Sequence, residues 1–329
     1  MNSIKDLIKV CIKNIIINRT HLFITSLVFS AFIATECRGY DGPIFDAMAQ
    51  LDEKQGFMSA INKVQQAKVS KLALFARSRK YLGENENEIL KLREKFPGLI
   101  ILGAPKYFLL KDDLTSKYIN RTIASIQKNN YKFIGEILYT HGDKSHGEQT
   151  LPGERYVDPL APNNLKFFNL LKKIKVPVMT HWEVYNWDRD WPKFSELYTR
   201  FPEITFIIPH MAFGHPKQVR LILSKHPNVY MTISKKEQDK KGYSDSNKSM
   251  LLGQGFLNKN GKIRSSWLKL IIDYSDRLMF ATDAHKTHRW EKYKEIVYNY
   301  RHFVTQLPPE VAKRVSYQNA EDLYGVKVE

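Results

Sequence analysis

Cysteine is scarce in this chain. The 329 residues include two cysteines, Cys11 and Cys37, and both lie in the N-terminal segment. The rest of the chain therefore cannot form a disulfide bond or a thiolate metal site. Any metal ion bound there must be held by nitrogen and oxygen ligands.

Several motifs are also missing. The sequence has no G-x-G-x-x-G or Walker pattern, which argues against a glycine-rich phosphate loop. It has no G-x-S-x-G elbow, and nothing indicates a cysteine nucleophile. These absences argue against nucleotide binding by a glycine-rich loop and against catalysis by a serine or cysteine nucleophile.

Acidic residues are too few to balance the basic ones. There are 51 Lys and Arg against 34 Asp and Glu, a net charge of +17. The basic residues are scattered, without an RNP, zinc-finger or basic-zipper pattern, so we expect no nucleic-acid partner. The charge could attract anionic substrates or surfaces, although a lysine-rich solvated exterior is the simpler interpretation.

The N-terminus has the pattern of an export signal. Four basic residues (Lys5, Lys9, Lys13 and Arg19) precede the uncharged apolar run Leu22–Ala34. This run is short for a membrane span, which needs about 20 residues, and suits the h-region of a signal peptide. We expect cleavage near residues 37–39 and a periplasmic or secreted protein. An uncleaved membrane anchor is the alternative, since the basic region is long, whereas Glu36 before Cys37 disfavours a lipoprotein signal.

Apolar runs alternate with amphipathic stretches from Tyr40 onward. Continuous apolar runs of this length are typical of strands buried on both faces of a parallel sheet. Eight of them in alternation with helices predict an α/β fold, a single-domain (β/α)₈ TIM barrel over residues 40–329 after a signal or anchor at 1–39. An open doubly wound sheet is the structural alternative. The runs are Pro43–Ala49, Lys71–Ala76, Leu99–Ala104, Phe133–Leu138, Pro177–His181, Thr205–His210, Val229–Ser234 and Arg277–Thr282.

Two connections are long, Thr140–Pro162 and Lys235–Arg264. Both follow predicted strands, so they belong to the C-terminal face of the barrel, where the active sites of such barrels lie. Loops of this length in a compact domain are usually functional.

Ionisable residues lie at or just beyond the C-terminal ends of five predicted strands. A strand buried on both faces tolerates such a group only when it is paired or acts as a ligand. Two imidazoles and a carboxylate are a common ligand set for a catalytic Zn²⁺. The five residues are Asp46, Glu136, His181, His210 and Asp283.

Several segments together resemble the amidohydrolase superfamily in its amidohydrolase-2 branch. VPVMTHW is similar to the strand-five histidine motif, FPEITFIIPHMAFG to the strand-six histidine motif and DRLMFATDA to the strand-eight aspartate motif. HPNVYMTIS resembles the intervening strand seven, and LPPEVAKRVSYQNAEDLYG the closing helices. The likeness covers residues 43–326 and implies a metal-dependent hydrolase.

Strand one departs from the family pattern Asp-x-His-x-His. Asp46 is kept, but Met48 and Gln50 stand where the family has metal-binding histidines. The segment FIGEILYT resembles members whose strand-four glutamate binds metal, which implies a Glu136, His181 and His210 site for one divalent ion, with Zn²⁺ preferred. The resemblance also implies that Asp283 is the catalytic base.

Substrate-binding candidates surround this predicted site. They comprise cationic, aromatic and imidazole side chains in the loops: Lys144, Arg155, Trp182, Tyr185 and His285. The cations could hold an anionic group of a small molecule, and the rings could stack on a substrate or only cap the barrel.

The sequence leaves the reaction open. We expect hydrolysis of a C–O, C–N or P–O bond, with decarboxylation as a variant known in the family. A metal-free barrel, either a lactonase-like enzyme or a non-catalytic binding protein, is the alternative, because the strand-one histidines are missing. The oligomeric state is not indicated, and a membrane contact is expected only if the N-terminal segment stays uncleaved.

Overall fold

Eight parallel strands form the centre of the fold. The computed structural model describes residues 39–78, 80–107, 113–141, 155–184, 186–234 and 255–328. Residues Gly42–Glu329 belong to one compact unit, in which the strands are ordered β1-β2-β3-β5-β8-β9-β10-β11. All eight predicted strands are present. Their bounds are β1 (Phe45–Leu51), β2 (Lys71–Ser78), β3 (Ile100–Ala104), β5 (Phe133–Leu138), β8 (Val178–His181), β9 (Phe206–Ile208), β10 (Val229–Ile233) and β11 (Leu278–Phe280).

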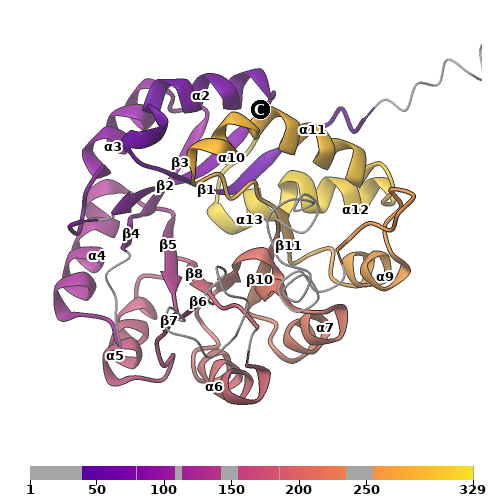
Figure 1. Cartoon of the computed structure of the whole chain (residues 1–329). Helices are drawn as coiled ribbons and strands as arrows, with labels where there is room; N and C mark the ends of the chain where they lie inside the picture. The colour runs from indigo at the N-terminus through magenta and orange to yellow at the C-terminus, as the bar shows by residue number, and fades with distance from the viewer. Residues whose placement is uncertain are drawn as a thin grey trace, which may run out of the picture. The chain divides into compact units, whose positions relative to one another are not determined.

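Helices surround these strands (Figure 1). They are α2 (Phe57–Gln66), α3 (Glu86–Lys95), α4 (Ser116–Asn129), α5 (Pro162–Leu171), α6 (Trp187–Arg200), α7 (Pro216–Lys225), α9 (Ser265–Asp273), α10 (Thr287–Glu291), α11 (Tyr293–Val304), α12 (Pro309–Lys313) and α13 (Asn319–Tyr324). Shorter elements are η1 (Glu53–Gln55), η2 (Pro209–Phe213), η3 (Arg314–Gln318), β4 (Lys106–Tyr107), and the antiparallel pair β6 (Thr140–His141) and β7 (Arg155–Tyr156).

The sheet closes between its first and last strands. The backbone N–H of Asp283 donates to the Met48 carbonyl at 2.9 Å, and that of Gln50 donates to the Ala284 carbonyl at 2.8 Å. These bonds join β1 to the segment that follows β11. The open-sheet alternative is therefore wrong, and the predicted (β/α)₈ barrel is confirmed.

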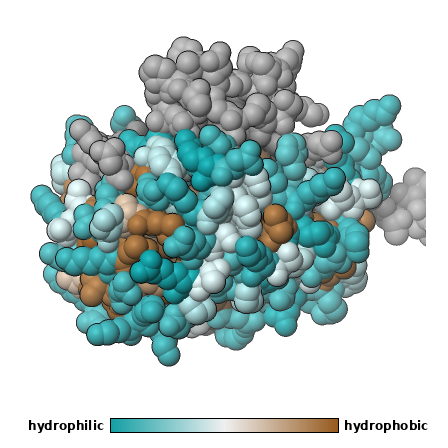
Figure 2. Space-filling view, turned by 90° about the horizontal axis from the view of Figure 1, so that it is seen from below, coloured by the Kyte–Doolittle hydropathy of each residue, from teal (hydrophilic) through white to brown (hydrophobic). Residues whose placement is uncertain are grey.

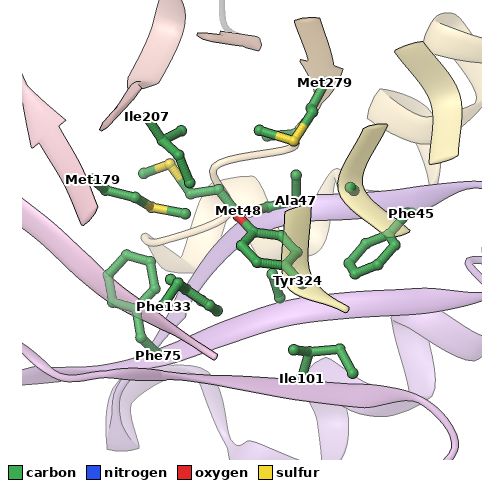
Figure 3. Close-up of a cluster of buried hydrophobic side chains, with 13 residues drawn as sticks. Phe45, Ala47, Met48, Phe75, Ile101, Phe133, Met179, Ile207, Met279 and Tyr324 are labelled. Carbon is green, nitrogen blue, oxygen red and sulfur yellow. Dashed lines mark hydrogen bonds between the residues drawn. The ribbon is translucent and has the colours of Figure 1, made fainter. Parts of the chain in front are cut away.

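Large apolar side chains fill the barrel interior. Phe75, Phe133 and Met179 pack there with Met48 of β1 (Figure 3). The C-terminal helix α13 contributes Tyr324, whose hydroxyl donates to the Ala47 carbonyl at 3.0 Å. Met48 is fully buried in this cluster, so its side chain is part of the core.

The exterior is mainly polar. Figure 2 shows a face on which hydrophilic residues predominate, with one group of apolar residues toward the left of the view and a few smaller apolar spots. Among the described residues, no helix is both long enough and apolar enough to cross a bilayer. The predicted export signal, including Leu22–Ala34, lies outside the described residues apart from its last position, and export stays a prediction.

Candidate active site

Glu136 enters the barrel through a distortion of β5. Between Ile134 and Ile137 the register against β8 contains one extra residue on β5, which is a β-bulge and turns a side chain from its regular direction. The preceding Gly135 is required there, because a Cβ at this position would collide with the Ala104 carbonyl and the Phe75 ring. The Glu136 side chain is buried, with Oε1 against Nδ1 of His181.

His181 is the last residue of β8 and is held from both sides. Its Nδ1 contacts Glu136, and its Nε2 is 3.0 Å from Oε1 of the buried Glu183. A carboxylate on the outer nitrogen of a histidine fixes the ring and directs the other nitrogen inward, as in many metal sites. Glu183 is itself anchored, since its backbone N–H donates to the Thr140 hydroxyl at 2.7 Å.

His210 lies just beyond its strand. The sequence predicted a strand that reached His210, but β9 ends at Ile208 and His210 belongs to the turn η2. Pro209 begins that turn, and residues 210–213 have φ values of 57°, 49°, 54° and 52°. Left-handed conformations cost non-glycine residues about 1 kcal/mol or more each and are concentrated at functional sites.

The His210 ring is oriented by β10. Its Nδ1 is 2.7 Å from the Ser234 hydroxyl, and its backbone N–H donates to the Thr232 hydroxyl at 3.0 Å. The Nε2 atom consequently faces the barrel axis, 3.7 Å from Oε1 of Glu136 and 3.7 Å from Oδ2 of Asp283.

Asp283 follows β11 and has a left-handed φ of 46°. Its carboxylate is buried and lies between His210 and His285, whose Nδ1 is 3.2 Å from Oδ2. Arg289 donates to its backbone carbonyl at 3.1 Å, which supports the strained conformation. The Asp283 carboxylate therefore lies beside His210, at the edge of the cluster formed by Glu136, His181 and His210.

Gln50 and Lys106 complete the cluster. Gln50 Nε2 donates to Asp283 Oδ1 at 2.9 Å and to Glu136 Oε2 at 3.2 Å. The buried Lys106 ammonium forms an ion pair with the same Glu136 Oε2. With Glu183, which contacts His181, the cluster contains three buried carboxylates, one ammonium and two imidazoles.

The charges perturb the pKa values within this cluster. Burial alone would raise the pKa of Glu136, but the charges of Lys106 and His181 hold it well below its usual range. Burial would lower the pKa of His181, yet Glu136 and Glu183 raise it. Burial lowers the pKa of Lys106 despite the opposing effect of Glu136. Buried ionisable groups that interact this strongly are candidates for a functional site.

The Glu136, His181 and His210 side chains fit a divalent ion. One nitrogen or oxygen atom from each lies within 4.8 Å of those from the other two, and all three residues are buried. Ligands bound to a tetrahedral Zn²⁺ at 2.0–2.1 Å lie about 3.3 Å from one another, close to the 3.7 Å between His210 Nε2 and Glu136 Oε1. The structure thus brings together the three residues that the sequence predicted as ligands.

Comparison with known proteins gives the family. A family model described as amidohydrolase matches residues 128–326. The chain belongs to the amidohydrolase family. It is therefore an enzyme, as its sequence predicted, and a hydrolase is the activity typical of the family. No curated protein matches this amidohydrolase significantly.

Solved structures resemble the amidohydrolase in fold. An uncharacterized TIM-barrel protein from Bordetella bronchiseptica has 12% identity and a TM-score of 0.56, covering 80% of this chain and 81% of that one. A protein from Acinetobacter baumannii, titled a probable 2-pyrone-4,6-dicarboxylic acid hydrolase, has 13% identity and a TM-score of 0.54, covering 86% and 100%. A Pseudomonas putida protein titled for the same activity has 14% identity and a TM-score of 0.55, covering 87% and 99%. At these identities the likeness shows the fold.

The other predicted site residues of the amidohydrolase are distributed differently. Arg155 of β7 is partly buried and pairs across the β6–β7 ladder with His141, whose ring stacks on His181 at 5.8 Å. Trp182 is buried against Phe194, with ring centroids 4.5 Å apart. Lys144 and Tyr185 lie outside the described residues. The substrate-binding roles of these residues stay predictions.

Asp46 was predicted at the C-terminal end of the first strand, which is wrong: it is the second residue of β1 (Phe45–Leu51). Its side chain joins the start of β1 to the segment that follows β11. It accepts hydrogen bonds from the Thr282 backbone at 2.8 Å, the Thr282 hydroxyl at 2.6 Å and the Tyr293 hydroxyl at 2.8 Å. Burial raises its pKa to about 6, although these hydrogen bonds oppose the shift. Its contacts make it part of the barrel closure.

Sequence reasoning missed three residues of this site. Lys106 follows the apolar run of β3 and Pro105, so its place near a strand end was the available signal. Glu183 stands two residues after His181, which a search for carboxylates near the histidine could have found. Gln50 was considered only as a weak metal ligand, whereas the structure shows it as a donor to two carboxylates.

Proposed function

We propose that this amidohydrolase is a hydrolase that uses one divalent metal ion, with Zn²⁺ preferred, bound by Glu136, His181 and His210. When bound, such an ion lowers the pKa of a water ligand and polarises the carbonyl or phosphoryl group under attack. The observation that carries the proposal is the convergence of three buried ligand atoms within 4.8 Å, beside the Asp283 carboxylate.

Asp283 is the proposed general base. Its Oδ2 lies 3.7 Å from His210 Nε2, at the inner edge of the ligand cluster. Its Oδ1 accepts from Gln50, while Oδ2 faces His210 and His285. This oxygen would take a proton from the attacking water and return it to the leaving group, a role that carboxylates perform in general acid–base catalysis.

Gln50 supplies a further polar atom for the reaction. Its Oε1 is buried and, within the described part of the chain, has no hydrogen-bond partner. Buried amide oxygens normally accept a hydrogen bond. We propose that this atom accepts one from the attacking water or from a donor group of the substrate.

The proposed substrate is a small anionic molecule with a C–O, C–N or P–O bond to be cleaved. Two of the similar structures are titled hydrolases of a dicarboxylic acid, which supports an anionic substrate class. Arg155 of β7, paired with His141 at the rim of the site, and Lys144 are the proposed contacts with its charged group. We also propose that the enzyme acts after export, on the basis of the apolar run Leu22–Ala34.

Metal analysis tests the proposal. The purified protein, supplemented with Zn²⁺ and desalted, should contain about one ion per chain by mass spectrometry, as one closed ligand set requires. His210→Ala should lose both the ion and the hydrolysis of a panel of lactones, esters, amides and phosphoesters. A wild-type protein that hydrolyses a member of the panel without bound metal would contradict the proposal.

A metal-free hydrolase is the second candidate, favoured by one specific observation. The Lys106 ammonium already contacts Glu136 and partly neutralises the cluster without an ion. Under this alternative, Glu136 would orient His181, and Asp283 alone would activate water. Undiminished activity after chelation would support it.

A further inference from the structure

The two oxygens of Glu136 have different surroundings. Oε1 faces the imidazoles, in contact with His181 Nδ1 and 3.7 Å from His210 Nε2. Oε2 faces two donors, the Lys106 ammonium and the Gln50 amide at 3.2 Å. A carboxylate that bridges two metal ions needs an oxygen for each, and here the second oxygen is already bound by a positively charged side chain.

The surroundings of Lys106 fix its position. It belongs to β4, which pairs with β2 through the Arg77–Lys106 register beyond the end of β3. The side chain is buried, and a buried ammonium is retained only where an acid compensates its charge. Glu136 provides that compensation directly.

Gln50 strengthens the same arrangement. It occupies the position on β1 nearest to both carboxylates, and the amide nitrogen it offers to Glu136 and Asp283 can donate but cannot ligate a cation. Met48, two residues earlier, packs in the barrel core with Met179. Toward Oε2 of Glu136, strand one therefore presents the Gln50 amide donor and, at Met48, an apolar side chain.

We infer that the Lys106 ammonium is a fixed counter-ion to Oε2 of Glu136, so that the single metal ion is held on the Oε1 side of this carboxylate. Lys106 is thus a positioning residue that acts through Glu136. This inference rests on the proposed metal site of Glu136, His181 and His210. A like charge so close in a buried site also weakens the affinity for that single ion.

The test is a titration of the metal-free protein with Zn²⁺ against a competing chelator, in mildly alkaline buffer, for wild type and Lys106→Met. Wild type should bind one ion per chain. Lys106→Met should also bind one, with a dissociation constant lower by about tenfold or more, because the repulsion between two cations is removed. Titration with Co²⁺ provides a second readout, since its visible spectrum reports the number and type of ligands.

Two variants serve as controls. Lys106→Arg keeps the positive charge and should retain the wild-type affinity. Lys71→Met removes another buried lysine, one that donates to the Gly98 carbonyl at the opposite end of β2, and should leave the affinity unchanged.

The outcomes separate the inference from the proposed function. A wild type that binds no ion and a Lys106→Met that binds one would refute the proposed function and also overturn the inference, because Lys106 would then exclude the single ion itself. One ion in wild type with unchanged or weaker binding in Lys106→Met would overturn the inference and leave the proposed function standing. Two ions in wild type would overturn the inference, and no ion in either protein would refute both.

Discussion

The side-chain amide of Gln50 donates a 2.9 Å hydrogen bond to Asp283, 233 positions further along the chain. The same amide nitrogen donates to Glu136 at 3.2 Å. One neutral side chain on the first strand thereby holds the proposed base and a proposed metal ligand at fixed positions. The sequence resemblance implied a metal-binding histidine at this position; in the structure Gln50 orients two carboxylates.

Replacement of Asp283 by Asn should separate catalysis from metal binding. The variant keeps the shape and the Gln50 contact region but removes the base, so activity should fall by about 10²-fold or more while the bound metal is largely retained. Steady-state kinetics and metal analysis of the same sample check both expectations. Loss of metal in Asp283→Asn would show that the aspartate is a ligand rather than the base.

Truncation of Met48 should mainly lower stability, whereas truncation of Gln50 should mainly lower activity. Met48→Ala opens a cavity in the core and should lower the free energy of unfolding by about 2–5 kcal/mol, with metal content nearly unchanged. Gln50→Ala should also keep its metal, but it releases Asp283 and Glu136, so activity should fall more than stability. Chemical denaturation measures the stability of both variants, and steady-state kinetics measures their activity. Loss of metal from a folded Met48→Ala protein would contradict the prediction for Met48.

Glu183→Gln should weaken metal binding without removing a ligand. Glu183 Oε1 lies 3.0 Å from His181 Nε2. Loss of a carboxylate that orients a histidine ligand lowers metal affinity by about 10–100-fold, and we expect a decrease of this size in Glu183→Gln. Glu196→Gln, an exposed carboxylate on α6, is the matched control. Equal affinities in the two variants would mean that Glu183 does not orient the ring.

His226 should make the fold sensitive to acid. Its ring is buried against Trp191 and Tyr198, and Nε2 is 3.1 Å from the Ser195 hydroxyl. Burial, with Lys225 nearby, lowers its pKa from 6.5 to about 4. His226 therefore binds a proton more readily in the unfolded chain than in the folded protein. The free energy of unfolding should be unaffected by His226 above about pH 6.5 and should fall by up to about 3 kcal/mol as the pH falls toward 4.

Denaturation curves of wild type and His226→Gln at several pH values between these limits measure the effect. The difference in stability between the two proteins should change by that amount across the interval. His302→Gln, at a partly exposed position, is the control and should follow the wild-type curve. A pH-independent difference for His226→Gln would show that the ring is not held neutral by the fold.

The sequence predicted the barrel well because buried parallel strands have a simple signature. Each of the eight apolar runs became a strand, with ends that differ by a few residues. Glu136 and His181 were recognisable as ionisable residues at the ends of such runs, where burial requires a function or a partner. The same argument placed Asp283 directly after the last strand.

The rest depended on geometry that no local pattern encodes. The bulge that redirects Glu136 involves the register between β5 and β8. The left-handed turn at residues 210–213 has ordinary residue types, with no glycine before Gly214. The ion pair of Lys106 with Glu136 joins two strands that are 30 positions apart, and a lysine near a strand end is usually solvated.

The contact of Asp283 with Gln50 also depends on the pairing of β1 with the segment that follows β11. Asp283 reaches Gln50 only after the last strand has paired with the first, through the Met48 and Ala284 carbonyls. A chain still emerging from a ribosome, or one shortened before β11, can contain Glu136, His181 and His210 and yet lack the base. We therefore expect a chain that ends before β11 to lack hydrolytic activity, because it lacks the proposed base.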